Sequence, residues 1–134
     1  MSAPVVHEHT VRIRPVDCDR QGVVHASRYA VFCEAAMVET LRAGLGDYRE
    51  LERQNVDFVL AEFRIRYFAP ARFDELLRFQ VRADRVGETS LTIGFDGLVG
   101  DRRVVHAVAR YVMVATDTGT KTPLIAGVRR MFGG

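Results

Sequence analysis

Two aspartates, a cysteine and a histidine lie in one short polar stretch, directly before the longest helix that the sequence predicts. Asp17, Cys18 and Asp19 come first, Gly22 follows, and His25 precedes a long apolar segment. A carboxylate in this position is a candidate base or nucleophile. The free N–H groups at a helix N-terminus can hold an oxygen that becomes negatively charged. This stretch is therefore the first candidate for an active site.

The segment that follows predicts a helix from about Ser27 to Ala43, because helix-favouring residues dominate it and neither glycine nor proline interrupts it. Ser27 is the expected N-cap, and Gly44 is the expected C-terminal cap. One broad side is apolar and comprises Tyr29, Phe32, Cys33, Ala36, Met37, Thr40 and Ala43. Further apolar residues stand among the charges on the other side. We therefore expect a curved sheet on one side of the helix and a partner on the other.

Composition places the chain among soluble globular proteins, with 48% hydrophobic and 27% charged residues in a total of 134. This length suits a single domain over residues 1–134. The net charge of +2 does not indicate a nucleic-acid partner, and no apolar run is long enough to span a membrane. The N-terminus lacks a signal-peptide pattern, so a cytoplasmic location with reduced Cys18 and Cys33 is expected.

Most of the remaining sequence alternates between apolar and polar residues, which is typical of strands. The predicted strands are Val5–Arg14, Val56–Phe68, Glu75–Val86, Thr89–Val99 and Arg102–Thr116, with a short helix over Asp47–Gln54. The last four strands are joined too tightly for parallel crossovers. The prediction is an α+β fold, in which a curved antiparallel sheet of about five strands wraps around one long central helix, with a short second helix. Residues 118–134 show no clear period.

Two motifs in this arrangement resemble a known family. The first is Asp17-Cys18-Asp19-x-x-Gly22-Val23-Val24-x-x-x-x-Tyr29, and the second is Tyr67-Phe68-Ala69-Pro70-Ala71-Arg72-Phe73-Asp74-Glu75-Leu76. Together they resemble the hotdog-fold acyl-CoA thioesterases of the 4-hydroxybenzoyl-CoA thioesterase type, over roughly Val11 to Asp117. The resemblance implies a homodimer or homotetramer with active sites between subunits. It also implies hydrolysis of an acyl-CoA thioester to the free acid and CoA, with no cofactor, since CoA is part of the substrate.

The resemblance also implies roles for the polar stretch. Asp19 matches the catalytic position, as general base on water or as nucleophile through a mixed anhydride. Gly22 and the backbone amides near Ala26 and Ser27 are the oxyanion candidates. Many members carry a Tyr-His or Asn-Asn pair where this chain has His25-Ala26, so His25 is expected to orient the thioester or the catalytic carboxylate. Asp17 is expected to be structural and to accept backbone N–H bonds.

Substrate contacts are less sharply indicated. Tyr29, Phe58 and Phe63 are candidates for lining an acyl pocket, although strict alternation places Phe58 and Phe63 on opposite faces of their strand. Arg85 is a candidate for the CoA phosphates, as are Arg102, Arg103, Arg129 and Arg130. Some relatives carry a basic cluster at the turn where this chain has Gly87-Glu88-Thr89. Its absence leaves an acyl-carrier-protein thioester open as the alternative substrate.

Other interpretations of the same residues remain. Both aspartates are also suited to capping turns only. Cys18 and His25 suggest a thiol nucleophile, but the flanking carboxylates would raise the thiol pKa. A hotdog dehydratase lacks its Gly-Pro segment here, and a domain that binds acyl thioesters without turnover is the non-enzymatic alternative. The histidines His7, His9 and His106 do not have metal-site spacing, so no metal is expected.

Overall fold

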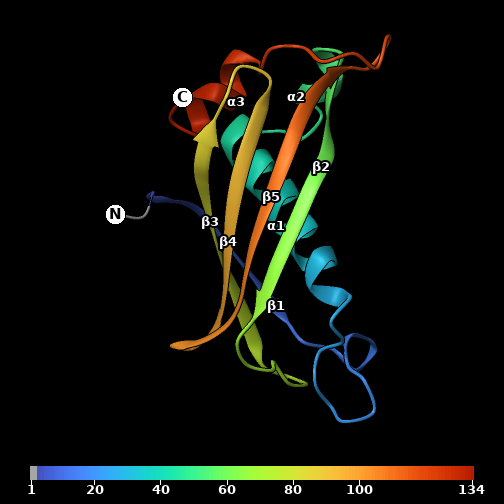
Figure 1. Ribbon diagram of the computed structural model, residues 1–134, viewed down its shortest axis with the longest axis vertical. Helices are drawn as coiled ribbons and strands as arrows, with labels where there is room; N and C mark the ends of the chain where they lie inside the picture. The colour runs from blue at the N-terminus through green and yellow to red at the C-terminus, as the bar shows by residue number, and fades with distance from the viewer. Residues whose placement is uncertain (1–2) are drawn as a thin grey trace.

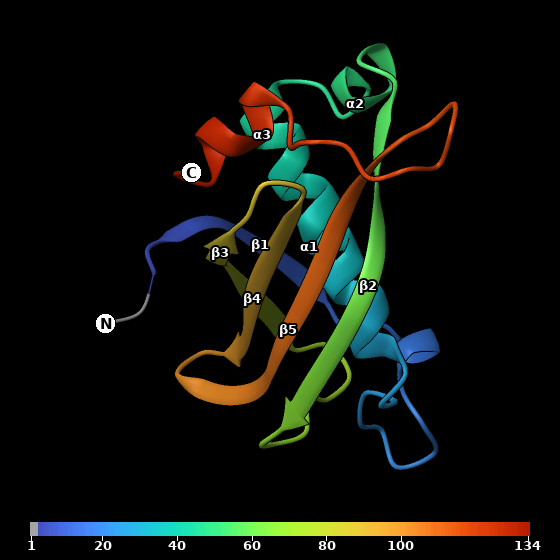
Figure 2. The ribbon, with the colours of Figure 1, turned by 45° about the horizontal axis from the view of Figure 1, so that its top comes forward.

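An 18-residue helix, α1 (Arg28–Leu45), lies against one face of a five-stranded antiparallel sheet in the computed structural model, which describes residues 3–134 (Figure 1). The strands are β1 (Val5–Arg12), β2 (Val56–Tyr67), β3 (Leu76–Val86), β4 (Ser90–Val99) and β5 (Arg102–Ala115). Their order across the sheet is β1-β3-β4-β5-β2, so β1 and β2 are the edges. The sheet curves around α1 (Figure 2). The predicted hotdog architecture is confirmed.

Three short helices complete the chain: the 3-10 helix Pro15–Asp17, α2 (Glu50–Arg53) and α3 (Ala126–Met131). The predicted second helix is present but shorter than expected. The helix α3 lies in the stretch that showed no period, and it buries Val128 among the other core residues. Among residues 3–134, no helix combines the length and the apolar character that a membrane crossing needs.

The predicted end of the central helix was wrong by two residues. Gly44 lies inside α1, and the left-handed cap is Gly46, whose φ is 82° and whose N–H donates to the Arg42 carbonyl. Gly44 has a packing role, because a Cβ there would stand 2.3 Å from the Met131 side chain of α3. The glycine therefore makes room for α3 to dock on α1.

The apolar side of α1 packs into the core against the sheet. The helix buries Tyr29, Phe32, Cys33, Ala36, Met37, Thr40 and Leu41, which confirms six of the seven predicted positions; Ala43 is exposed and Leu41 is buried instead. The Phe32 ring lies 6.3 Å from that of Phe79 on β3. Ala107 and Ala109 on β5 are fully buried. Small side chains on the sheet let the helix approach closely.

A β-bulge changes the alternation in β2. The register with β5 shifts between Leu60 and Glu62, so one extra residue is inserted in the edge strand. The prediction that Phe58 and Phe63 face opposite sides was therefore wrong. Both side chains line the same groove beside α1, and the Phe58 ring lies 6.0 Å from that of Tyr111 on β5.

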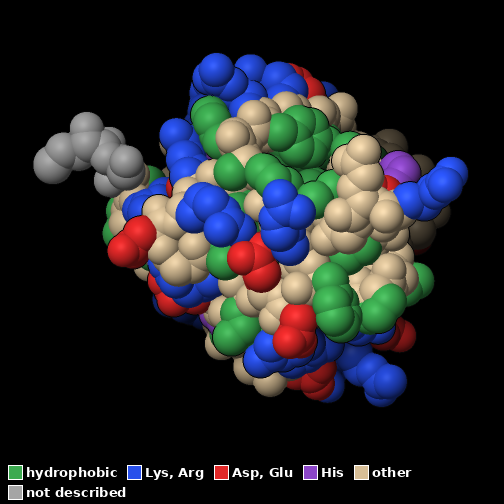
Figure 3. Space-filling view, turned by 90° about the horizontal axis from the view of Figure 1, so that it is seen from below, with side chains coloured by type: hydrophobic (Ala, Val, Ile, Leu, Met, Phe, Trp, Pro, Cys, Tyr) green, Lys and Arg blue, Asp and Glu red, His purple; other side chains and the backbone are tan. Residues whose placement is uncertain are grey.

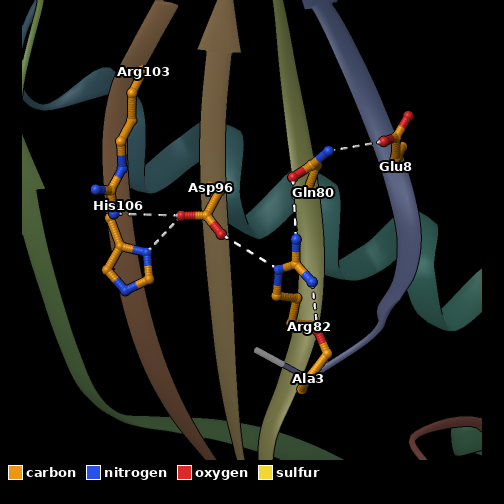
Figure 4. A network of polar contacts seen from close by, with 7 residues as sticks. All are labelled: Ala3, Glu8, Gln80, Arg82, Asp96, Arg103 and His106. Atoms are coloured by element: carbon orange, nitrogen blue, oxygen red, sulfur yellow. Dashed lines mark hydrogen bonds and ion pairs between the residues drawn. The ribbon is translucent and has the colours of Figure 1, made fainter. Parts of the chain in front are cut away.

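The outer face of the sheet carries a polar network that crosses four strands (Figure 4). Asp96 on β4 lies 2.8 Å from His106 Nδ1, 3.5 Å from Arg82 and 3.8 Å from Arg103. Gln80 continues the network to Glu8 on β1 with a 3.2 Å hydrogen bond. This face therefore carries paired charged side chains, in contrast to the apolar inner face.

Candidate active site

The polar stretch is held in place by Asp17, whose side chain is only 1% exposed. Its carboxylate accepts hydrogen bonds from the Arg14 backbone N–H at 2.8 Å and from Arg28 Nε at 3.1 Å, and Arg28 Nη2 lies 2.9 Å away. The Asp17 carbonyl accepts the N–H of His25 at 2.8 Å. One buried carboxylate therefore ties both ends of the loop to the first turn of α1, as expected of a structural aspartate.

We expect Asp17→Ala to lower the free energy of unfolding by about 2–3 kcal/mol, because it leaves a partly buried guanidinium and a backbone N–H without their acceptor. The matched control is Glu62→Ala, which breaks the exposed Glu62–Arg64 pair (3.3 Å) and is expected to cost less than about 0.5 kcal/mol. Urea unfolding of the two variants and the wild type measures the difference. Equal stability of both variants would contradict the anchoring role.

Asp19 is exposed at the tip of the loop and shapes its own turn. Its Oδ1 accepts the N–H of Gln21 at 2.8 Å and that of Val23 at 3.4 Å, and its carbonyl accepts the N–H of Gly22 at 3.1 Å. Gly22 has a φ of 76°, which a side chain would strain. The turn-capping interpretation thus accounts for one carboxylate oxygen. The other oxygen, Oδ2, accepts no hydrogen bond from residues 3–134 and is free to act on a ligand.

The loop packs directly on the second motif, about 50 residues away in sequence. Val24 N–H donates to the Ala71 carbonyl at 2.8 Å, and Phe73 N–H donates to the Gly22 carbonyl at 3.2 Å. A β-bridge pairs Val23 with Arg72. The fold therefore brings the two motifs into direct contact, although they are far apart in the sequence.

The backbone N–H groups just before α1 differ in whether they have an acceptor. Ser27 N–H lies 3.4 Å from Nδ1 of His25, and the Ser27 hydroxyl lies 3.0 Å from the same nitrogen. Ser27 holds the N-cap position but makes no side-chain cap. No acceptor within the described part of the chain receives the N–H of Ala26. Of the predicted oxyanion donors, the Ala26 N–H is thus the one without an acceptor. The Ser27 N–H is directed to Nδ1 of His25, and the Gly22 N–H is bonded to the Asp19 carbonyl.

Tyr67, at the end of β2, reaches the backbone of Ala26 from the sheet. Its hydroxyl donates to the Ala26 carbonyl at 3.3 Å, and its ring lies 5.6 Å from that of Tyr29. Sequence reasoning did not assign Tyr67 to the site, although it stands first in the second motif. Tyr29, a predicted substrate contact, is 3% exposed and packs in the core beneath Tyr67. Tyr29 therefore packs against Tyr67 from the core side, and its predicted contact with substrate stays a prediction.

A groove of about 510 Å³ runs between α1 and β2. Its lining is mainly apolar and comprises Ala30, Val31, Cys33, Glu34, Met37, Val38, Leu41, Tyr48, Asp57, Phe58, Leu60, Phe63 and Tyr111. One end lies at Ala30 in the first turn of α1, and the other lies at Tyr48 before α2. The predicted Phe58 and Phe63 both line it. The arrangement can hold an apolar chain whose reactive end points to the helix N-terminus.

Arg85 lies far from the loop. It stands near the end of β3, an 11-residue strand whose beginning follows the second motif. At about 3.4 Å per residue, the strand places Arg85 roughly 30 Å from its first residue, Leu76, and from the second motif. A role of Arg85 in CoA binding stays a prediction.

The two cysteines are free thiols. Partial burial, with Asp17 and then Asp19 beside it, raises the pKa of Cys18, as expected from its neighbours. Burial raises the pKa of Cys33 to about 12. Neither environment favours a thiolate nucleophile. Within residues 3–134, no group of three or more His, Cys, Asp or Glu side chains is arranged to hold a metal ion.

Comparison with known proteins agrees with this fold. The thioesterase superfamily matches residues 21–106, a range that starts just after Asp19 and extends through the second motif. The acyl-CoA thioester hydrolase YbgC of Shigella flexneri is 36% identical over 97 residues, which cover 72% of this chain and 67% of YbgC.

Solved structures show the same fold at low identity. A thioesterase-superfamily protein from Jannaschia has a TM-score of 0.88 at 18% identity, covering 95% of this chain and 90% of its own. The 1,4-dihydroxy-2-naphthoyl-CoA thioesterase of Synechocystis has a TM-score of 0.85 at 16% identity, covering 94% of each chain. The narrower 4-hydroxybenzoyl-CoA type stays a prediction. The chain belongs to the thioesterase superfamily and has the hotdog fold that its two motifs predicted.

Proposed function

We propose that this protein hydrolyses acyl-CoA thioesters to the free acid and CoA, with Asp19 as the catalytic carboxylate. The observation that carries the proposal is the placement of a free Asp19 oxygen and a free Ala26 N–H on one anchored loop. The similarity to the acyl-CoA thioester hydrolase YbgC supports the same substrate class. The acyl-carrier-protein thioester is the alternative, because this chain has Gly87-Glu88-Thr89 at the turn that is basic in some relatives.

The chemistry follows from the two groups. Asp19 removes a proton from water as the water oxygen bonds to the thioester carbon, or its own oxygen bonds there to form a mixed anhydride that water then opens. The carbonyl oxygen becomes negative in either path, and the Ala26 N–H at the helix N-terminus stabilises it. The carbon–sulfur bond then breaks, and the CoA sulfur leaves and takes a proton. His25, held beside Ser27, is placed to orient the thioester.

The groove between α1 and β2 is the proposed acyl site. It begins at Ala30 in the first turn of α1, four residues after Ala26, and Met37, Leu41, Phe58 and Phe63 give it an apolar interior. Apolar pockets of this size bind ligands mainly by burying hydrocarbon surface. We infer that the acyl group is an aromatic or a medium-length chain laid along α1.

We further propose a homodimer, or a homotetramer built from it, that covers the groove and Asp19. The β2 edge is unpaired and 12 residues long, and its Val59 and Leu60 side chains are 50% and 52% exposed. Such an edge is a template for pairing with another strand. The apolar residue Val31 on the neighbouring helix face is also exposed, at 47%.

Replacing Val59 and Leu60 together by lysine is expected to give a monomer, because edge lysines block strand pairing. The control is Val16→Lys, which changes a 69% exposed side chain away from β2. Light scattering after size-exclusion chromatography measures the mass of each. A wild type that is already monomeric, or a lysine variant that keeps the wild-type mass, would contradict this interface.

Thiol release from a panel of aryl, short, medium and long acyl-CoAs tests the function directly. Turnover with at least one of them is the expected result, and the best substrate identifies the acyl group. An enzyme that ignores all CoA thioesters but hydrolyses the same acyl groups on acyl carrier protein would support the alternative carrier. Tight binding of acyl-CoA without any hydrolysis would support a binding protein.

A further inference from the structure

An exposed aromatic ring with two arginines lies at the end of β2, next in sequence to Tyr67 of the candidate active site. Phe68 follows β2 and is 44% exposed. The guanidinium carbon of Arg103 lies 4.2 Å from the centroid of its ring, and that of Arg66 lies 5.7 Å away. The backbone fixes the ring in place, because Phe68 N–H donates to the Val104 carbonyl at 2.8 Å. We call Arg66, Phe68 and Arg103 the arginine–phenylalanine cluster.

We propose that this cluster binds the nucleotide end of CoA, with the adenine stacked on the Phe68 and guanidinium planes and the phosphates held by Arg66 and Arg103. This inference rests on the proposed acyl-CoA hydrolysis. Arginine is suited to both contacts, since its planar guanidinium stacks on rings and donates paired hydrogen bonds to phosphate. CoA carries roughly three to four negative charges at neutral pH.

The position of the cluster fits the length of the substrate. Tyr67, the residue before Phe68, donates its hydroxyl to the Ala26 carbonyl at 3.3 Å. Because neighbouring residues of a strand point to opposite faces, Tyr67 reaches the active-site loop while Phe68 points to the outer face. The pantetheine arm is about as long as four extended residues, roughly 14 Å. It can therefore leave the thioester at Ala26, pass the end of β2 and place the nucleotide on Phe68.

The two arginines have donors to spare. Arg66 forms no ion pair within the described part of the chain, and the only carboxylate paired with Arg103 there is Asp96 at 3.8 Å. Asp96 is already held by His106 at 2.8 Å and by Arg82 at 3.5 Å (Figure 4). An incoming phosphate would thus meet guanidinium groups that have no close carboxylate of their own.

The end of the molecule that carries the loop supports this assignment. It shows Lys or Arg side chains interspersed with hydrophobic ones, with several Asp or Glu side chains among them (Figure 3). Phe73 and Leu76, at the turn that packs on the loop, are 54% and 48% exposed. A surface that mixes apolar and cationic side chains suits a ligand with an aromatic base and several phosphates.

The other arginines considered from sequence are less suitable. Arg102 is engaged with both oxygens of Glu75 at 2.9 Å. Arg129 donates to the carbonyls of Gly87 and Glu88. Arg85 and Arg130 belong to β3 and α3 at the opposite end of the sheet from the loop (Figure 1). Of the five candidates, Arg103 alone has its guanidinium group against an exposed ring, and it lies at the same end of the sheet as the loop.

The test compares one acyl group on two carriers. The double variant Arg66→Ala/Arg103→Ala and the single variant Phe68→Leu are expected to raise KM for acyl-CoA about tenfold, as the loss of two solvent-exposed ionic or cation–π contacts implies. Both variants are expected to keep wild-type kcat and KM for the same acyl group on pantetheine, which lacks the nucleotide. Arg49→Ala, which changes an exposed arginine just before α2, is the matched control and is expected to behave as wild type with both substrates.

The outcomes separate this site from the proposed function. An unchanged KM for acyl-CoA in the double variant, an equal loss with both carriers, or a larger effect of Arg49→Ala would each overturn the nucleotide site. Absence of hydrolysis by the wild type with either carrier would contradict the proposed function instead. In that case, calorimetric titration with 3′-phosphoadenosine 5′-diphosphate decides, because the site requires that the wild type bind it and that the double variant bind it at least tenfold more weakly.

Discussion

Replacing Asp19 by asparagine is expected to lower kcat for acyl-CoA hydrolysis by about 10²–10⁴-fold, the usual contribution of a positioned acid or base. The amide keeps the Oδ1 acceptor for the N–H groups of Gln21 and Val23, so the turn is retained. It replaces the free Oδ2 by a group that cannot take a proton from water or attack a carbonyl. KM should therefore change little, and steady-state thiol release measures both constants.

The adjacent thiol provides the control for this experiment. Cys18→Ala is expected to keep wild-type turnover, because burial and the two flanking carboxylates raise the pKa of Cys18 and keep it as a thiol. Circular dichroism and thermal unfolding verify that both variants are folded. If the asparagine variant retains wild-type kcat while Cys18→Ala loses it, the cysteine and not the aspartate carries the reaction.

Replacing Ala26 by proline is expected to lower kcat by about 10²–10³-fold, the cost of removing one oxyanion donor. Proline removes an N–H just before the start of α1 that has no acceptor within residues 3–134. Proline is tolerated just before or at the first helical positions, so α1 should form normally. Because the developing negative charge exists mainly in the transition state, the effect is expected on kcat with little change in KM.

Ala26→Gly is the matched control, since it keeps the N–H and removes only a methyl group. It is expected to stay within about threefold of the wild type, since an exposed methyl group contributes little. Equal losses in the proline and glycine variants would show that the side chain or the loop conformation matters and that the amide does not. Single-turnover kinetics with acyl-CoA in limiting amounts avoids any influence of product release on this comparison.

Periodicity and the two motifs predicted the parts of the fold that local pattern determines. The long uninterrupted apolar segment gave α1 and most of its buried side, and the alternating segments gave all five strands. The roles of Asp17 and of the Asp19 turn were also accessible, because short-range hydrogen bonds to neighbouring N–H groups follow from residue type and spacing. These features depend on contacts within a few residues.

The features that were missed depend on tertiary contacts. The bulge at Leu60 and Glu62 leaves no mark in a hydrophobic pattern, yet it brings Phe58 and Phe63 to the same groove. Gly44 is a residue type typical of a C-terminal cap, but here the Met131 side chain fills the space that a Cβ of residue 44 would occupy. The contact of Tyr67 with Ala26 joins residues 41 positions apart. Periodicity carries no information on such pairings.

The most direct test of the account is to mix the purified protein, in excess, with an acyl-CoA that it binds, and to follow free thiol and free acid over one turnover. A carboxylate and a free amide on one loop predict complete conversion of the bound thioester into equal amounts of CoA and acid. Recovery of the intact thioester from the complex after prolonged incubation would contradict the enzymatic account.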